Sequence, residues 1–135
     1  MIFRKLLLGA AALALLASPA FAEDYAGGAI KSTEVGGKEM LTDANGMTLY
    51  VFDKDTAGVS NCNDTADSKC ATSWPPLMAA AGASPDGDYT IITRADGTQM
   101  WAYQGKPLYM WAKDTKAGDT TGDGIGGVWH IAYEE

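Results

Sequence analysis

One seven-residue segment occurs twice in this chain, and that repeat constrains the fold more than any other feature. Leu49–Asp55 reads Leu-Tyr-Val-Phe-Asp-Lys-Asp, and Leu108–Asp114 reads Leu-Tyr-Met-Trp-Ala-Lys-Asp 59 positions later. Both copies have the pattern Leu-Tyr-x-aromatic-x-Lys-Asp, and both follow a turn that contains glycine. Such a repeat indicates two copies of one supersecondary unit, which bury their apolar faces against each other.

Each copy of this segment ends a series of short strands. The pattern in these stretches has a period of two residues, although the apolar side of residues 29–35 is ambiguous. Pairs such as Gly36-Gly37 and Asn45-Gly46 are typical of hairpin turns. The order strand, turn, strand, turn, strand recurs with an offset of about 60 residues. The expected strands cover residues 29–35, 38–42 and 47–53 in the first copy, 89–94, 98–103 and 107–112 in the second, and 128–133 at the C-terminus.

The strand pattern predicts an all-β fold. Two pseudo-repeated antiparallel three-stranded meanders are expected to pack into one small domain with a C-terminal strand, and the repeats cover about residues 29–78 and 89–133. Residues 23–28 are expected to be a loose lead-in, and residues 69–73 a single helical turn. Residues 78–87 are rich in Ala, Gly and Pro, which predicts a linker between the repeats.

The N-terminus has the pattern of a secretory signal peptide. Arg4 and Lys5 form a short positive region, residues 6–17 contain only Leu, Ala and Gly, and positions 20–22 read Ala-Phe-Ala. The 12-residue apolar run is shorter than the ~20 residues that a membrane-spanning helix needs. We therefore expect cleavage of residues 1–22, one domain of residues 23–135 without membrane insertion, and a periplasmic or secreted location.

The charge of the mature chain restricts its partners. Without Arg4 and Lys5 the chain keeps 8 of its 10 basic residues against 17 acidic ones, a net charge of −9. Nucleic acids and anionic membrane surfaces attract clusters of Lys and Arg, so neither is expected as a partner. An acidic surface keeps an exported protein soluble, and it is also compatible with binding of a hard cation.

The chain has two cysteines, Cys62 and Cys70. An even number of cysteines in an exported protein predicts a disulfide bond. The bond would close a short loop, which is worth about 2.5 kcal/mol on the chain-entropy model. Seven residues separate the two cysteines, a spacing that matches neither a CxxC redox motif nor a zinc site.

The repeated segments carry a more specific motif, Tyr-x-aromatic-x-x-Asp. It consists of Tyr50, Phe52 and Asp55 in the first copy and of Tyr109, Trp111 and Asp114 in the second. With the flanks Ser60-Asn61-Cys62, Trp74-Pro75-Pro76-Leu77 and Gly126-Gly127-Val128-Trp129-His130, the chain resembles a bacterial family. The family is described as predicted lipoproteins or as the secreted repeat of unknown function, and the similarity covers roughly residues 38–133.

This resemblance implies export and a repeated β unit. It implies no enzymatic activity, because none is established for the family. Many relatives are lipoproteins, whereas this chain has no acceptor cysteine after its apolar run, so we expect a soluble exported form. Cys62 and Cys70 lie further apart than we expect for the family, which suggests a longer loop closed by the same bridge.

Trp74 and Trp129 are expected to anchor the two halves, because each follows the loop after its own copy of the motif. Alternate residues of a strand share one face, so the tyrosine and the second aromatic residue of each motif lie together. This arrangement predicts an aromatic interface between the halves, with the tyrosine hydroxyls at its margin. An exposed aromatic groove for a sugar or a peptide is the alternative.

Asp55 and Asp114 stand where each motif strand becomes a loop. A carboxylate at such a place accepts backbone N–H hydrogen bonds and fixes the turn. The alternative is a hydrolase in which the two carboxylates converge as general acid and base.

The best candidates for metal ligands are Asp114, Asp119, Asp123 and His130. Carboxylates in a loop rich in Gly and Thr suit calcium, although the position expected for a bidentate Glu is occupied by His130. His130 and the single methionines suggest copper as a second possibility. A packed histidine, core-filling methionines and a flexible surface loop are the plainer interpretations.

Taken together, these residues predict an exported cell-envelope protein of unknown biochemical activity. We expect a non-enzymatic structural or binding module that needs no cofactor and meets an unknown envelope partner or small ligand. A periplasmic protein that binds calcium or copper is the alternative, and a hydrolase with paired aspartates is a third possibility.

Overall fold

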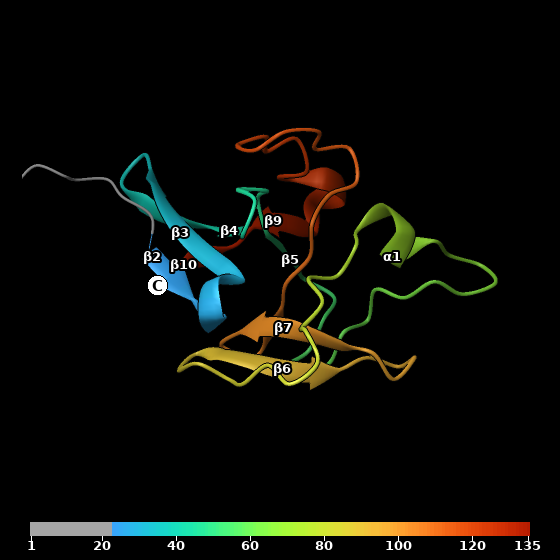
Figure 1. Cartoon of the computed structure of the whole chain (residues 1–135). Coiled ribbons are helices and arrows are strands. Elements are labelled where there is room, and N and C mark those ends of the chain that lie inside the picture. The colour runs from blue at the N-terminus through green and yellow to red at the C-terminus, as the bar shows by residue number, and fades with distance from the viewer. Residues whose placement is uncertain (1–22) are drawn as a thin grey trace, which may run out of the picture.

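Short β-strands in three antiparallel sheets dominate the chain (Figure 1). The computed structural model describes residues 23–135, so the expected signal peptide at residues 1–22 lies outside the described residues. The all-β class is confirmed. No helix within residues 23–135 is long and apolar enough to cross a membrane.

A four-stranded sheet contains the first expected hairpin. Its strands lie in the order β10 (Tyr133–Glu134), β4 (Lys38–Asp43), β3 (Ile30–Val35) and β2 (Glu23–Tyr25). Strands β3 and β4 meet at Gly36-Gly37, where φ angles of +61° and +86° fit residues without a Cβ atom. The N- and C-terminal segments of the described chain therefore belong to one sheet (Figure 1).

The prediction of a loose lead-in at residues 23–28 is wrong. Strand β2 pairs with β3, and a 3₁₀ turn, η3 (Ala26–Gly28), follows it. Tyr25 holds this segment in place, because its ring stacks on Tyr89 with a centroid distance of 4.7 Å. Its hydroxyl also donates to the Glu134 carboxylate at 2.7 Å. Both contacts come from residues distant in sequence, so the local pattern of residues 23–28 could not indicate them.

A three-stranded sheet forms the second expected meander. It consists of β6 (Tyr89–Thr93), β7 (Gln99–Tyr103) and β8 (Lys106–Pro107), paired in chain order. Strand β7 is the central strand, and its residues 100–103 are all buried. This sheet lies at the bottom of Figure 1, below the four-stranded sheet and the motif strands.

The third strand of the first copy leaves its own hairpin. Strand β5 (Tyr50–Phe52) pairs with β9 (Trp129–Ile131) from the C-terminal end of the chain. The segment before β5 joins β4 through an isolated bridge between Thr42 and Thr48, where the Asp43 amide donates to the Met47 carbonyl and the Leu49 amide to the Leu41 carbonyl. The strand expected at residues 47–53 is therefore shorter than predicted, because the chain changes its partner within that stretch.

The other expected strands around the motif are also interrupted. In the segment 107–112, strand β8 ends at Pro107 and Tyr109 forms isolated bridges to Tyr50 and Pro76. The C-terminal strand expected at 128–133 divides into β9 and β10. The Ala132 amide donates to the Leu49 carbonyl and the Ala132 carbonyl accepts from the Leu41 amide, so the pairing of the C-terminal segment changes from β5 to β4 at this residue.

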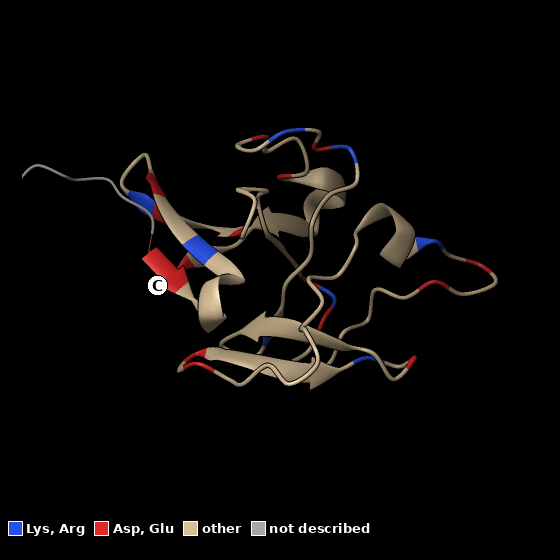
Figure 2. Cartoon of the chain, viewed as in Figure 1, with Lys and Arg blue, Asp and Glu red and all other residues tan. Residues whose placement is uncertain are grey.

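The buried side chains form two hydrophobic clusters. One centres on residues such as Leu41, Trp101 and Leu108, and the other contains the motif tyrosines together with Trp74 and Trp129. One helical turn, α1 (Cys70–Ser73), lies at the expected place, and a 3₁₀ turn, η4 (Ile125–Gly127), precedes β9. Charged residues lie mainly at turns and loops, and the Lys and Arg residues are scattered over several of them (Figure 2).

Candidate functional site

The two copies of the motif meet at their tyrosines. The Tyr50 amide donates to the Tyr109 carbonyl at 2.7 Å, and the Tyr109 amide donates to the Tyr50 carbonyl at 2.9 Å. Both tyrosines are fully buried. Each tyrosine therefore gives its amide and its carbonyl to the other. The contact between the halves has approximate two-fold symmetry.

The tyrosine hydroxyls extend this exchange to the motif aspartates. The Tyr50 hydroxyl donates to Oδ2 of Asp114 at 2.6 Å, and the Tyr109 hydroxyl donates to Oδ2 of Asp55 at 2.7 Å. Each tyrosine thus binds the aspartate of the opposite copy. Burial is the main cause that raises the pKa of both hydroxyls, so they remain protonated donors at neutral pH.

The second oxygen of each aspartate fixes the loop that follows it. Oδ1 of Asp55 accepts the Asn61 amide at 2.6 Å, and Oδ1 of Asp114 accepts the amide and the hydroxyl of Thr121 at 2.9 and 2.6 Å. No hydrogen bond joins Asp55 to Asp114 among the described residues. The two carboxylates therefore lie in two separate, equivalent sets of donors.

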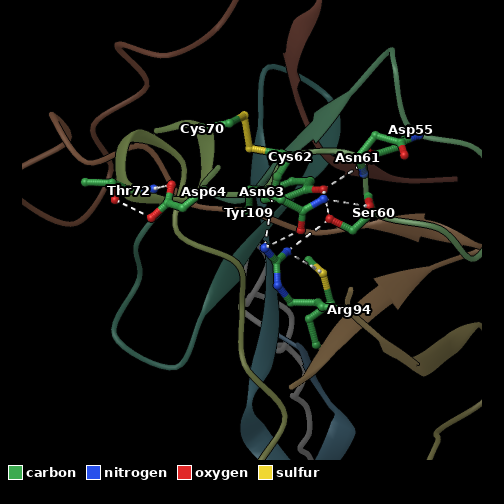
Figure 3. Close-up of a disulfide and its surroundings, with 11 residues drawn as sticks. Asp55, Ser60, Asn61, Cys62, Asn63, Asp64, Cys70, Thr72, Arg94 and Tyr109 are labelled. Carbon is green, nitrogen blue, oxygen red and sulfur yellow. Dashed lines mark hydrogen bonds between the residues drawn. A yellow bond between two sulfur atoms is a disulfide. The ribbon is translucent and has the colours of Figure 1, made fainter. Parts of the chain in front are cut away.

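A buried arginine completes the set around Asp55. Arg94 is only 5% exposed, and its guanidinium donates to Ser60 Oγ at 3.0 Å and to the Cys62 carbonyl at 2.9 Å (Figure 3). Ser60 Oγ lies 2.6 Å from the Tyr109 hydroxyl. We call the series Arg94, Ser60, Tyr109 and Asp55 the Arg94 relay.

The hydrogen positions in the Arg94 relay follow from its ends. Arginine can only donate and an ionised carboxylate can only accept. Ser60 therefore accepts from Arg94 and donates to Tyr109, which in turn donates to Asp55. Burial raises the pKa of Asp55, and the charge of Arg94 acts in the opposite direction. A buried positive charge and a partly buried negative charge are thus joined through two hydroxyls.

In the second copy a main-chain amide contacts the tyrosine hydroxyl, at the position equivalent to Ser60. The Gly122 amide donates to the Tyr50 hydroxyl at 3.1 Å, where the first copy has the Ser60 side chain. Gly122 has no room for a side chain. An added Cβ atom would lie 2.9 Å from Cη2 of Trp74 and 3.0 Å from Cγ of Trp111.

Four aromatic rings form a continuous stack between the halves. Trp74 and Trp129 stack at the centre with a centroid distance of 3.8 Å and an interplanar angle of 3°. Phe52 stacks on Trp129 at 4.2 Å, and Trp111 stacks on Trp74 at 4.1 Å. Each motif ring therefore stacks on the anchor tryptophan of the opposite half.

The motif tyrosines meet this stack edge-on. Tyr50 contacts Trp74 at 5.4 Å and Tyr109 contacts Trp129 at 5.2 Å, both in T-shaped geometry. Trp74 and Trp129 are 5% and 4% exposed, whereas the end rings of Phe52 and Trp111 are partly exposed. We call the six rings (Tyr50, Phe52, Trp74, Tyr109, Trp111 and Trp129) the aromatic seam. Its buried centre does not have the form of an open aromatic groove.

The expected disulfide joins Cys62 to Cys70. Cys62 is fully buried and lies in the second hydrophobic cluster. The bridge fixes the loop that carries Ser60 and the Cys62 carbonyl, so it holds two acceptors of Arg94 in place (Figure 3).

The structure places the metal candidates in separate hydrogen-bond sets. Asp119 accepts the Thr115 amide at 2.9 Å, Asp123 accepts the Ile131 amide at 3.2 Å, and His130 contacts Asp53 at 2.8 Å. Within residues 23–135 no three His, Cys, Asp or Glu side chains come together to hold a metal ion. The sulfur of the buried Met100 contacts the Arg94 guanidinium at 3.5 Å, an unsuitable neighbour for a copper ion.

An open groove adjoins the first copy of the motif, and Phe52 and Asp55 of that copy are among its lining residues. Two neighbouring cavities, of 310 and 250 Å³, share Val51, Asp53 and Lys106. The first also contains Asp55 and the second His130. We call this pair of cavities the Val51 groove. Its rim combines carboxylates with an exposed lysine, and nothing in the motif pattern indicated it.

Sequence reasoning missed three residues of the site. Arg94 was expected only as the end of a strand, although it is the one arginine in residues 23–135, and a sole arginine beside apolar residues is a usable signal. Ser60 and Gly122 carry no such signal. Their roles depend on contacts across 49 and 72 residues of sequence.

Comparison with family models supports the resemblance noted in the sequence. The model described as a secreted repeat of unknown function matches residues 31–78 and again residues 90–133. The two matches contain the two copies of the motif. Comparison with curated proteins and with solved structures gave no match.

Proposed function

The chain belongs to this family of secreted repeats, and from that premise we propose that it is a non-enzymatic, exported structural or binding module of the cell envelope. The observation that carries the proposal is the internal use of the motif. Its tyrosines, aspartates and second aromatic residues bind one another across the two halves. Motif side chains that bind one another across the halves stabilise the fold.

The surroundings of the aspartates argue against a hydrolase. Both oxygens of Asp114 and both oxygens of Asp55 accept hydrogen bonds from the protein itself. A general base needs a lone pair directed at the substrate. Each carboxylate is held by a tyrosine of the opposite repeat and by the loop that follows it, and no hydrogen bond joins the two carboxylates within residues 23–135, which supports a structural role for both.

The Val51 groove is the surface that we propose for a partner. Its larger cavity, 310 Å³, falls at the lower end of the roughly 300–1,000 Å³ that small-ligand sites occupy. Lys106, Asp53 and His130 supply charged or polar groups at its rim. A small polar ligand or a segment of an envelope partner fits this chemistry, whereas the few scattered cations do not suit nucleic acid.

Native mass spectrometry with metal analysis tests this proposal on protein purified from the exported fraction of the producing cells. We expect the mass of a chain that begins at Glu23, with one disulfide and without a stoichiometric metal. A stoichiometric metal ion would contradict the proposal and favour the metal-binding alternative.

The binding role is tested with the low-molecular-weight extract of the same envelope fraction. We expect chemical-shift changes in NMR spectra at the Val51 groove, and Lys106→Gln should weaken them. Lys116→Gln removes the same charge from a residue that lines neither cavity of the groove, so it is the matched control. Equal effects of the two substitutions would contradict a role for the groove.

A further inference from the structure

The contact between the two halves has the geometry of a symmetric dimer interface. In such an interface residue i of one subunit contacts residue j of the other, and residue j contacts residue i in return. Tyr50 and Tyr109 exchange both main-chain hydrogen bonds, and each hydroxyl binds the aspartate of the other half. From either end, the stack in the aromatic seam begins with a motif ring, continues with the two anchor tryptophans and ends with the other motif ring.

The geometry points to a second copy of this chain as a partner of the seam. We propose that the molecule is a two-fold dimer fused into one chain, and that two chains can exchange halves through the same contacts. Half 1 comprises residues 23–78 and half 2 comprises residues 89–135. This inference goes beyond the proposed function, because it concerns how copies of the module associate and requires no ligand.

Each half leaves buried groups without partners when the other is absent. The Tyr109 hydroxyl needs Asp55, and the Asp114 carboxylate, 7% exposed, needs Tyr50. Strand β5 pairs with β9, and β4 pairs with β10, so half 1 also relies on strands of half 2. These requirements are met equally well by half 2 of the same chain or of a second chain.

The connection between the halves decides which of these occurs. Ala79 bonds Gln99 on one edge of β7, and Tyr89 pairs with Tyr103 on the other edge. Four residues along β7 and one strand spacing on each side separate these positions by about 16 Å. Residues 80–85 are mostly exposed, and Ala83 among them packs against the hydrophobic cluster of Leu41 and Trp101.

Deletion of residues 80–85 tests the proposal in the otherwise complete chain. Four residue steps then lead from Ala79 to Tyr89 and reach at most about 14 Å, which is too short to close the fold within one chain. We expect a dimer by light scattering, of twice the monomer mass, that unfolds cooperatively. The matched control replaces the same six positions by Gly and Ser and is expected to be a monomer.

A cross-link shows whether the dimer uses the same contacts. Val51 and His130 are direct partners in β5 and β9, and antiparallel partners lie about 4.5–5.5 Å apart, within the range of a disulfide. With Val51→Cys and His130→Cys, non-reducing gels should show a covalent dimer of the deletion variant and a monomer of the control. A folded monomer, a deletion variant that stays unfolded at high concentration, or a dimer without the cross-link would each overturn the proposal.

Discussion

The Tyr109 hydroxyl donates a 2.7 Å hydrogen bond to Asp55, a residue of the opposite repeat, while its own repeat supplies Asp114 to Tyr50 at 2.6 Å. Each copy of the motif therefore gives one donor to the other and takes one acceptor from it. The motif is the device that joins the two halves, and its preservation in both copies has a structural reason.

Removal of the Tyr109 hydroxyl should destabilise the protein. Tyr109→Phe leaves the partly buried Asp55 carboxylate and the buried Ser60 hydroxyl short of a partner, a loss of about 1–3 kcal/mol. Chemical denaturation measures the free energy of unfolding. Tyr133→Phe removes a hydroxyl that forms no hydrogen bond within residues 23–135, and its effect should stay within about 0.5 kcal/mol. If Tyr109→Phe lowered the free energy of unfolding as little as Tyr133→Phe does, the relay would contribute nothing to stability.

A methyl group at Gly122 should separate the stacked tryptophans. Gly122→Ala brings its Cβ to 2.9 Å from Trp74 and 3.0 Å from Trp111, and overpacking of this kind costs about 1–3 kcal/mol. Near-ultraviolet circular dichroism reports the coupling of stacked indole rings and should weaken. Gly124→Ala has φ +85° but nothing within 4 Å of the added atom, so it should lower stability without changing the spectrum. An unchanged spectrum in Gly122→Ala would refute the contact.

Lysine should not replace the buried Arg94. The guanidinium donates to Ser60, Cys62 and Asn63 at once, and a lysine ammonium group cannot match that planar set of donors. Arg94→Lys should lower the free energy of unfolding by about 2–4 kcal/mol, since partners of a buried charge lose their hydrogen bonds. The exposed Lys69→Met is the control and should change stability little. A fully stable Arg94→Lys protein would contradict the relay.

The pKa of Asp55 should lie above the ordinary aspartate value of 3.8, and the pKa of Asp96 should lie below it. Burial raises the pKa of Asp55, whereas hydrogen bonds from Thr98 lower the pKa of Asp96. Carbon-13 NMR of the carboxyl groups measures both midpoints. A midpoint of Asp55 below 3.8 would contradict this prediction.

The two shifts have opposite consequences for stability. A raised pKa in the folded state gives stability that is present below the unfolded pKa and is lost as the pH rises through the folded value. A lowered pKa gives stability that is lost on acidification. The stability of wild-type protein relative to Asp55→Asn should therefore increase as the pH falls from neutrality through the folded pKa of Asp55, and denaturation at several pH values measures it. Relative to Asp96→Asn it should decrease at low pH.

Much of the fold follows from local pattern. The Gly36-Gly37 turn, the hairpin of β3 and β4, and the hairpin of β6 and β7 were predicted, because they depend on neighbours in sequence. The same holds for the pairing of Cys62 with Cys70. The repeat also indicated the family correctly.

The crossing of the chain between sheets could not be predicted. Tyr50 and Tyr109 look like ordinary strand residues in sequence, and only the folded chain brings their main-chain groups together. The exchange of hydroxyl partners depends on that crossing. Arg94 was missed because its acceptors lie in a loop about 30 positions earlier.

The unequal surroundings of the two tyrosines bear on the history of the protein. In an assembly of identical subunits every substitution appears on both sides of the symmetry axis at once. In one continuous chain a substitution appears once, so the two sides can diverge independently. Phe52 now stands opposite Trp111, and the Ser60 side chain stands opposite the Gly122 amide. One side of the contact therefore has a buried cation in this chain, while the other has a bare backbone amide.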